Sequence, residues 1–351
     1  MRILWVGKAS QNASAGDEVF DRMVIGCIRA SGHTVIEIFP RRLSQTRSLF
    51  NLCIRRIPHY RSWYDCSDNY AALKAACIDC DGALVSWEPF DKLAYSLPIP
   101  TIPILHNVTS SSLPAFLPRS FAARILATHA RRWENVCYSS RRFLAVACLS
   151  LTDLAGLRIR FPHTRLLHCP PGAPPPTPLA ANATFRPEIV VTGTYGWTPK
   201  NRDVLRFAHE YAPQPGRLDV FADGLPQQAT RMLAARPIVR DTTRSTIRLG
   251  LITDRFTAGH KLKTTEYIGG NCIVLTFADI EQDFLDIPDR EYFIRKLKHA
   301  REITSHAAEL SRVDPAELRS RFAEFKRRCL ECFDWRLTSD RLLATLAEGV
   351  K

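Results

Sequence analysis

Long apolar runs are missing from this chain of 351 residues. The first run, Ile3 to Val6, has four residues and is too short for the apolar region of a signal peptide, which needs about 7 to 15. The longest run, Phe143 to Leu151, has nine residues, whereas a membrane-spanning helix needs about 20. We therefore expect a cytoplasmic protein without a transmembrane helix, in which most of the eleven cysteines are buried thiols rather than disulfides.

Several catalytic signatures are also absent. The chain has no Gly-x-Gly-x-x-Gly dinucleotide fingerprint, no phosphate-binding P-loop and no Gly-x-Ser-x-Gly nucleophile turn, which argues against dehydrogenases, P-loop kinases and serine hydrolases. Two Cys-x-x-Cys pairs, Cys77 with Cys80 and Cys329 with Cys332, have the spacing of zinc ligands. They lie far apart in helical segments, and a structural zinc site needs four converging ligands, so no metal is expected.

Acidic residues are scarce relative to basic ones. The chain has 48 Lys and Arg against 35 Asp and Glu, a net charge of +13. Up to Gly172 there are 21 basic and 12 acidic residues, so the first half carries +9 and the rest +4. Such an excess favours anionic partners, namely nucleic acid, a membrane surface or a phosphorylated substrate.

Strand-like and helix-like segments alternate along the chain, which predicts parallel sheets covered by helices on both faces. Strands are expected at 2–6, 34–38, 82–86, 101–105, 142–147, 164–167, 188–192, 217–221, 247–252 and 272–276. Helices are expected at 17–31, 69–78, 120–136, 151–157, 201–211, 225–235, 261–268, 289–303, 314–331 and 337–348.

A proline-rich segment interrupts this alternation and is typical of a semi-rigid linker. We predict a first domain over residues 1–172, a linker over 173–187, a second domain over 188–335 and a C-terminal helix over 336–351 that packs back on the first domain. Two doubly wound domains of this kind would face a cleft at the carboxyl ends of their strands.

The most informative segment begins at Gly259 and runs into a helix with Lys261, Lys263 and Glu266, followed by an apolar strand. Amide groups at a helix start attract phosphate, and lysines in a first turn oppose the helix dipole unless an anion is bound there. Lys263 and Glu266 are three residues apart and share a face of the helix. A Lys/Glu pair on a solvated helix surface is the alternative interpretation.

The span Gly259 to Val274 resembles the nucleotide-sugar signature of family 4 glycosyltransferases, in the branch that reads Gly-x-(Arg/Lys)-Leu-Lys-x-x-Glu, then Gly, then an apolar strand. The resemblance implies the GT-B architecture of two Rossmann-like domains, a retaining reaction and a nucleotide-sugar co-substrate, with no other cofactor. It places Lys261, Lys263, Gly259 and His260 at the donor diphosphate and Glu266 at the ribose. The family's earlier Glu is Ala258 here, so the donor sugar stays open.

A second segment, 190–203, resembles the first strand and loop of the same family's donor domain. We expect Gly193, Thr194 and Asn201 to form the donor loop and Lys200 to reach a phosphate. The glycine permits close approach of the backbone to a ligand, and Asn201 is suited to cap the following helix. A turn with an N-cap and no ligand is the alternative interpretation.

In the first domain, two residues are candidates for catalysis. His106 ends a strand where family members often carry a sugar-binding His, although a lone His is commonly structural. The small, polar loop 7–17 follows the first strand, and Asp17 is either an acceptor-side base, as an inverting reaction would need, or the N-cap of the next helix.

Residues 41–61 contain six arginines and no acidic residue, interleaved with apolar side chains. Such a mixture is typical of a segment that lies on an anionic bilayer, although a solvated basic face is the alternative. We take Arg41, Arg42, Arg55 and Arg56 as the candidates for membrane or acceptor binding.

The sequence therefore predicts a peripheral enzyme of the inner membrane face that transfers a sugar from a UDP- or GDP-sugar to a cell-envelope polysaccharide or lipid-linked acceptor. Two alternatives stay open: a DNA-modifying glycosyltransferase, and a basic nucleic-acid-binding protein without enzymatic activity. Nucleic acid is the less favoured partner.

Overall fold

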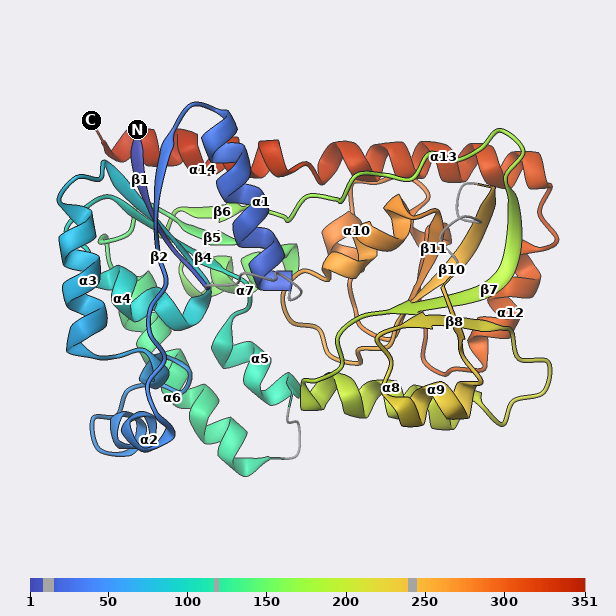
Figure 1. Cartoon of the computed structure of the whole chain (residues 1–351), viewed down its shortest axis with the longest axis horizontal. Coiled ribbons are helices and arrows are strands. Elements are labelled where there is room, and N and C mark those ends of the chain that lie inside the picture. The colour runs from blue at the N-terminus through green and yellow to red at the C-terminus, as the bar shows by residue number, and fades with distance from the viewer. Residues whose placement is uncertain (9–15, 117–119, 239–244, 351) are drawn as a thin grey trace. The chain divides into compact units, whose positions relative to one another are not determined.

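The chain folds into two compact units (Figure 1). The structure is a computed structural model that describes residues 1–8, 16–116, 120–238 and 245–350. Unit 1 consists of Met1–Pro171, Ala258–His260 and Trp335–Lys351, and unit 2 consists of Gly172–Thr257 and Lys261–Asp334. The predicted loop 7–17 lies largely outside the described residues.

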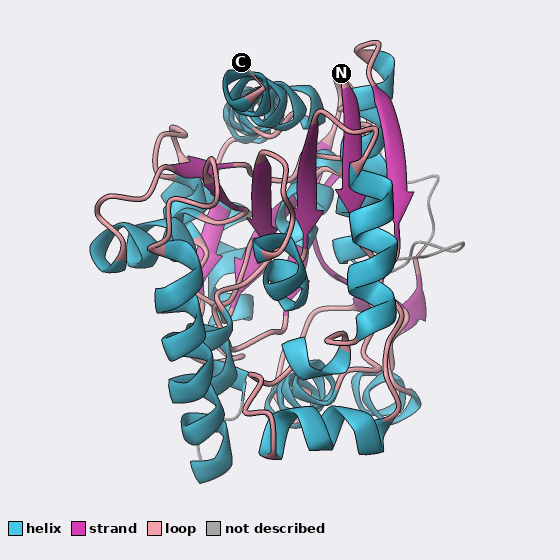
Figure 2. Cartoon of the chain, turned by 90° about the vertical axis from the view of Figure 1, so that its left-hand side faces the viewer, coloured by secondary structure: helices cyan, strands magenta, loops and turns pink. Residues whose placement is uncertain are grey.

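Unit 1 is built on a six-stranded parallel sheet in the order β2-β1-β3-β4-β5-β6. The strands are β1 (Arg2–Val6), β2 (Thr34–Ile38), β3 (Gly82–Ser86), β4 (Thr101–Leu105), β5 (Val146–Cys148) and β6 (Leu166–His168). The helices are α1 (Gly16–Ala30), α2 (Gln45–Cys53), α3 (Ser67–Cys77), α4 (Asp91–Tyr95), α5 (Thr109–Phe116), α6 (Phe121–Tyr138), α7 (Leu151–Arg160) and α14 (Trp335–Gly349), with 3₁₀ turns η1 (Arg61–Trp63) and η2 (Glu88–Phe90). β3 and β4 are buried along their whole length, because helices cover both faces of the sheet (Figure 2).

Unit 2 repeats this architecture with the strand order β12-β11-β10-β7-β8-β9. Its strands are β7 (Thr184–Thr192), β8 (Val220–Asp223), β9 (Arg236–Pro237), β10 (Thr246–Ile252), β11 (Cys272–Thr276) and β12 (Ile294–Lys296). Its helices are α8 (Thr198–Tyr211), α9 (Gln227–Leu233), α10 (Leu262–Gly269), α11 (Arg290–Phe293), α12 (Glu302–Leu310) and α13 (Pro315–Cys332), with a 3₁₀ turn η4 (Glu281–Phe284). The predicted fold class, two doubly wound parallel α/β domains, is confirmed.

The C-terminal helix α14 belongs to unit 1, where it packs against α1. The Trp335 ring lies edge-on to Phe20, with ring centroids 5.8 Å apart. Farther along the helix, Glu348 accepts a hydrogen bond from Arg165 at 3.1 Å. The helix thus adds apolar and ionic contacts to unit 1.

Several expected elements differ in their bounds, among them β5, β6 and β8, and two segments differ in kind. The predicted helix 289–303 is instead α11, the edge strand β12 and α12, because Ile294–Lys296 pair in parallel with Val274–Thr276 of β11. The predicted linker 173–187 ends early, because β7 begins at Thr184 and pairs with Thr246 of β10. Pro187 is accommodated within β7 because the pairing register shifts between Ile247 and Leu249, which is where a strand tolerates proline.

Candidate functional site

In unit 2, a lysine cluster surrounds the start of α10. Lys261 is the N-cap residue and Lys263 lies in the first turn, which has no acidic residue. Lys261 Nζ forms an ion pair with Asp254 at 3.1 Å and lies 4.1 Å from the Phe256 ring centroid. Burial opposes the charge of Asp254, but Lys261, Lys200 and Lys263 outweigh it and lower the pKa of this carboxyl. Lys261 is thus already neutralised by a neighbour.

Lys263 is held differently, because its Nζ donates to the main-chain carbonyl of Thr192 at the end of β7. Burial lowers the pKa of Lys263 to about 8, and the nearby charge of Lys200 adds to the shift. The ammonium groups of Lys263, in the first turn of α10, and Lys200 therefore repel each other. A bound anion would stabilise this arrangement.

Gly193 makes this arrangement possible. It has a φ of +144°, and a Cβ atom built on it would lie 1.6 Å from Nζ of Lys263. A Cβ on Gly224, which follows β8, would lie 2.1 Å from the carbonyl oxygen of Gly193. The ends of β7 and β8 therefore approach each other by their backbones alone, and a side chain at position 193 would displace Lys263.

The other predicted donor-side residues surround this cluster. Thr194 and Glu266 are exposed, and Lys200 lies half-buried in the first turn of α8. Asn201 was expected to cap α8, but the helix begins three residues earlier, at Thr198, with Pro199 in its first turn. The Asn201 side chain instead donates to the carbonyl of Tyr195 at 3.3 Å, so it fixes the donor loop from within the helix.

Sequence reasoning missed Tyr267. Its hydroxyl accepts a hydrogen bond from the Thr192 amide at 2.8 Å and donates to the Leu251 carbonyl at 3.2 Å, which joins α10 to the ends of β7 and β10. Gly250 makes room for the ring, since a Cβ there would lie 2.4 Å from Cγ of Tyr267. A lone glycine inside an apolar strand was the available signal.

We expect Tyr267→Phe to lower protein stability by about 1 to 2 kcal/mol, because the half-buried Thr192 amide loses its acceptor. The change should also loosen the turn at Gly193. Chemical denaturation of the variant and of the wild type measures the first effect, and an unchanged midpoint would contradict the role given to the hydroxyl.

In unit 1, a second polar group lies at the carboxyl ends of β1, β3 and β4. Ser86, the last residue of β3, contacts Nε2 of His106 at 2.9 Å and also donates to Oδ1 of Asp21 on α1. The Phe20 ring packs edge-on against the imidazole, with centroids 5.1 Å apart. Burial lowers the pKa of His106 to about 4, so the imidazole is neutral at pH 7.

Asp17 lies inside the first turn of α1 and is not the residue that precedes it, so the expected N-cap role is wrong. Its carboxylate pairs with Nζ of Lys8 at 2.5 Å. Burial opposes ionisation, but Lys8 outweighs it and lowers the pKa of Asp17. A carboxylate held in this way stays ionised and is a weak base.

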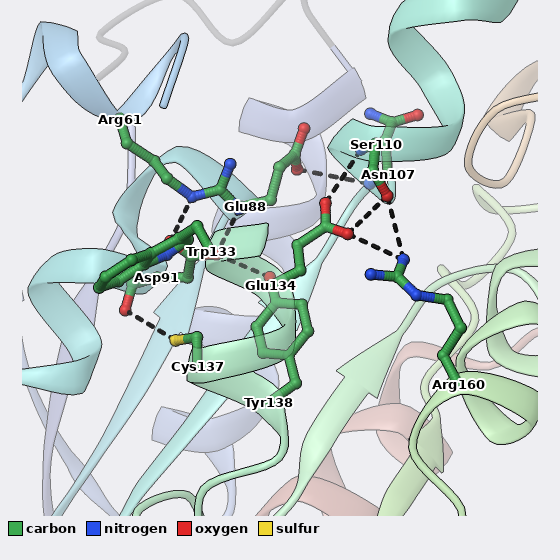
Figure 3. A network of polar contacts seen from close by, with 10 residues as sticks. All are labelled: Arg61, Glu88, Asp91, Asn107, Ser110, Trp133, Glu134, Cys137, Tyr138 and Arg160. Atoms are coloured by element: carbon green, nitrogen blue, oxygen red, sulfur yellow. Dashed lines mark hydrogen bonds and ion pairs between the residues drawn. The ribbon is translucent and has the colours of Figure 1, made fainter. Parts of the chain in front are cut away.

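A network of buried ion pairs supports the segment that follows His106 (Figure 3). Glu88 accepts a hydrogen bond from the Asn107 amide at 3.4 Å, and burial raises the pKa of Glu88 to about 8. Glu134 accepts hydrogen bonds from the amide and hydroxyl of Ser110 and from Arg160. These contacts, which sequence reasoning also missed, fix the backbone on both sides of the turn after β4.

Gly259 and His260 fall in the short stretch Ala258–His260 that groups with unit 1. The Gly259 amide donates to Oδ2 of Asp153 at 3.1 Å. Its φ is +62°, and a Cβ there would lie 2.2 Å from the His106 carbonyl oxygen. The amide expected at the donor diphosphate is therefore engaged by Asp153, and only glycine fits at this position.

The basic run of residues 41–61 divides into different environments. Arg42 stacks on Trp63 at 4.2 Å, Arg55 pairs with Asp65 at 3.0 Å, and the Arg41 amide donates to Asn69. Arg56 is exposed, whereas Arg61 is fully buried against Asp91 and belongs to the core. Between Arg42 and Arg55, helix α2 and the residue after it expose three apolar side chains, Leu49, Phe50 and Ile54.

Two absences in the described part of the chain concern metals and membranes. No group of three or more His, Cys, Asp and Glu side chains among the described residues is arranged to hold a metal ion. None of the helices that these residues form combines the length and the apolar character that crossing a bilayer requires.

Two parallel six-stranded α/β units in one chain define the GT-B class of fold, and solved structures with this fold match the whole chain. The pneumococcal O-GlcNAc transferase GtfA, in complex with UDP and GlcNAc, matches with a TM-score of 0.61 and 9% identity, over 100% of this chain and 99% of that one. The UDP-forming alpha,alpha-trehalose-phosphate synthase from Burkholderia xenovorans, in complex with glucose-6-phosphate, matches with a TM-score of 0.58 and 9% identity over 99% of both chains.

A third neighbour is an alpha-glucosyltransferase in complex with UDP and a 13-mer DNA containing an HMU base, with a TM-score of 0.52 and 12% identity over 99% of both chains. No model of a known protein family matches the sequence. No curated protein matches it either. At these identities the neighbours establish the fold, and the chemistry must be argued from the residues of this chain.

Proposed function

We propose that this protein is a glycosyltransferase that uses a nucleotide-sugar donor. The observation that carries the proposal is the lysine cluster of unit 2, in which Lys261 and Lys263 at the start of α10 lie near Lys200 of α8, beside the glycine turn at Gly193. Asp254 neutralises Lys261, which leaves Lys263 and Lys200 for the diphosphate. Glu266, which is exposed one turn along the helix, would bind the ribose hydroxyls, as the resemblance to family 4 implies.

UDP is the favoured nucleotide, because the neighbours named above contain or form it. When the glycosidic bond breaks, negative charge develops on the leaving diphosphate. The start of α10 and Lys263 would stabilise that charge, which is the main electrostatic demand of the reaction. His106 would orient the sugar through a hydrogen bond to a hydroxyl.

We propose retention at the anomeric carbon, as in family 4, rather than inversion. An inverting reaction needs a base on the acceptor side, and the only candidate from the sequence, Asp17, is ion-paired with Lys8. NMR of the freshly formed product measures its anomeric configuration. An inverted product would contradict the proposal and would require a base other than Asp17.

A thermal-shift screen against UDP, GDP, CDP and dTDP tests the donor. A ligand at about 100 times its dissociation constant stabilises the protein by about 2.7 kcal/mol. We expect the largest shift with UDP. The absence of a shift with every nucleotide would overturn the proposal.

The affinity for UDP should depend on the protonation of Lys263. A bound diphosphate favours the ammonium form, so it raises the pKa of Lys263 above its free value of about 8. Affinity should therefore be full below pH 8 and fall by up to about tenfold per pH unit above it. Titration calorimetry between pH 7 and 9.5 measures this, and Lys263→Arg, which stays charged, should flatten the dependence.

For the acceptor, we propose a cell-envelope polysaccharide or a lipid-linked glycan at an anionic membrane surface. The exposed side chains Leu49, Phe50 and Ile54 lie among Arg47, Arg55 and Arg56, and each arginine near an anionic surface adds about 1 kcal/mol. Sedimentation with phosphatidylglycerol-containing vesicles, but not with phosphatidylcholine alone, is expected. The double change Arg47→Ala and Phe50→Ser should abolish it, and equal binding by the variant would contradict this surface.

DNA is the second candidate acceptor, because one neighbour is in complex with DNA and the first 172 residues carry +9. A DNA-binding enzyme, or a nucleic-acid-binding protein without activity, would show duplex binding that falls steeply with salt. Only the enzyme would combine this with stabilisation by UDP.

A further inference from the structure

Asp21, Ser86 and His106 form a buried chain of hydrogen bonds in unit 1. Ser86 Oγ lies between Oδ1 of Asp21 and Nε2 of His106, and the second oxygen of Asp21 accepts the Lys8 amide at 3.1 Å. All three side chains are less than one-tenth exposed. The turn at Gly7 is closed over the carboxylate, since a Cβ there would lie 2.3 Å from Oδ2 of Asp21.

The protons of this chain can be counted. A serine hydroxyl has a single proton to donate, and a neutral imidazole carries a proton on one nitrogen. When Ser86 donates to the ionised Asp21, its oxygen accepts from Nε2–H of His106. The other imidazole nitrogen, Nδ1, then carries a lone pair, and since Ser86 occupies Nε2, a ligand must use Nδ1.

We propose that Asp21 and Ser86 are positioning residues that decide, through this chain, whether His106 presents Nδ1 to a substrate hydroxyl as an acceptor or as a donor. The identity of the ligand as a sugar hydroxyl rests on the proposed function, whereas the coupling between Asp21 and the imidazole does not.

Both hydrogen bonds of the Asp21–Ser86–His106 chain reverse their direction when Asp21 is protonated. Asp21 then donates to Ser86, and Ser86 donates to Nε2. In this reversal the Ser86 proton passes to Asp21, the Nε2 proton passes to Ser86 and Nδ1 takes one proton from solvent, so the three side chains gain one proton in total. The imidazole stays neutral in both states and changes only its tautomer.

The surroundings of Asp21 place this reversal near neutral pH. Burial raises the pKa of Asp21 to about 7, and the hydrogen bond from Ser86 opposes the shift. Among the described residues, the charged and titratable groups around it are Asp17 on its own helix, Lys8 after β1 and His106 after β4. The Lys8 ammonium is paired with Asp17, and His106 is neutral.

Nitrogen-15 NMR of the full chain labelled at histidine tests the coupling without any substrate. His106→Gln assigns the signal by removing it. In the wild type we expect the Nε2–H tautomer above pH 8 and the Nδ1–H tautomer below pH 6. Asp21→Asn keeps an oxygen for the Lys8 amide and turns an NH₂ group towards Ser86, so it should lock Nδ1–H at every pH.

Matched variants make the test specific. Ser86→Ala should abolish the pH dependence of the tautomer, and Ser86→Thr should restore it. Asp68→Asn, an exposed substitution in the first turn of α3, should leave the tautomer unchanged. The same His106 tautomer in the wild type and in Asp21→Asn at pH 8.5 would overturn the proposal.

Kinetics with the nucleotide sugar that gives turnover complete the test. At pH 8.5 we expect Asp21→Asn to change kcat/KM by at least tenfold, and the two proteins should converge below pH 6. If the tautomer follows Asp21 but no sugar is transferred, the proposed function fails and the positioning chain stands. If sugar is transferred while the tautomer ignores Asp21, the positioning chain fails and the function stands.

Discussion

Lys263→Ala is expected to lower turnover with the preferred nucleotide-sugar by at least about 100-fold, which corresponds to about 2.7 kcal/mol of lost transition-state stabilisation. The charge that develops on the leaving diphosphate is the largest electrostatic change in the reaction. Unlike Lys261, which is paired with Asp254, Lys263 donates its Nζ to the main-chain carbonyl of Thr192 rather than to a carboxylate.

The same substitution should not destabilise the protein. Burial and Lys200 lower the pKa of Lys263 to about 8, below its ordinary value, so the folded state disfavours the ammonium form at pH 7. Removing it relieves repulsion with Lys200. The melting temperature without ligand should therefore be equal to or above that of the wild type, while the shift produced by UDP shrinks.

Two comparisons make this result interpretable. Lys298→Ala removes an exposed lysine of the same unit and should leave both turnover and the UDP shift unchanged. Lys263→Met keeps the apolar stem against Tyr195, whose ring centroid lies 4.9 Å from Nζ, and should be as inactive as the alanine variant. Turnover by Lys263→Met within threefold of the wild type would refute the role given to the ammonium.

The bounds of strands were predictable from the sequence where a short strand-forming segment is flanked by residues typical of turns. β1, β2, β3, β4 and β11 were predicted with their observed bounds, since all five are short segments rich in β-prone residues, and all but β2 are buried along most of their length. The segment 289–303 was misjudged because the edge strand β12 contains Arg295 and Lys296, which suit a helix surface equally well. Only pairing with β11 determines its conformation.

The candidate site was predictable where its residues lie close together in the sequence. Lys261, Lys263 and Glu266 belong to one segment, and the first turn of a helix explains their chemistry. The chain of Asp21, Ser86 and His106 comes from three separate elements, and each residue alone resembles an ordinary buried polar group. Its weak signals were an aspartate on the buried side of α1 and a serine that ends an apolar strand.

Arg61 shows that an arginine counted from the sequence does not always contribute to the basic surface, because a buried acidic partner can neutralise it. It belongs to the arginine-rich run 41–61, yet it is fully buried and paired with Asp91, 30 residues away along the chain. Burial opposes the charge of Arg61, but Asp91 outweighs it and raises the pKa of the guanidinium. A charge count therefore overstates the basic surface of the first unit.

Asp91→Ala is expected to have the largest effect on stability of any substitution considered, a loss of about 3 to 5 kcal/mol. The Asp91 carboxylate accepts two hydrogen bonds from Arg61, one from Trp133 at 3.0 Å and one from the Tyr138 hydroxyl at 2.7 Å (Figure 3). Alanine leaves a buried guanidinium without a counter-charge. Native proteins are stable by only about 5 to 15 kcal/mol, so this loss should reduce the yield of folded protein at 37 °C.

The double variant Arg61→Met with Asp91→Leu separates loss of charge balance from loss of packing. It removes both charges and keeps most of the apolar volume, and replacing a buried pair in this way is often close to neutral. We expect it to be more stable than Asp91→Ala by at least about 2 kcal/mol in urea denaturation, even though Trp133 and Tyr138 lose their acceptor. If the double variant is the less stable of the two, the unpaired guanidinium of Arg61 is not what destabilises Asp91→Ala, and charge balance contributes little to the stability of the unit.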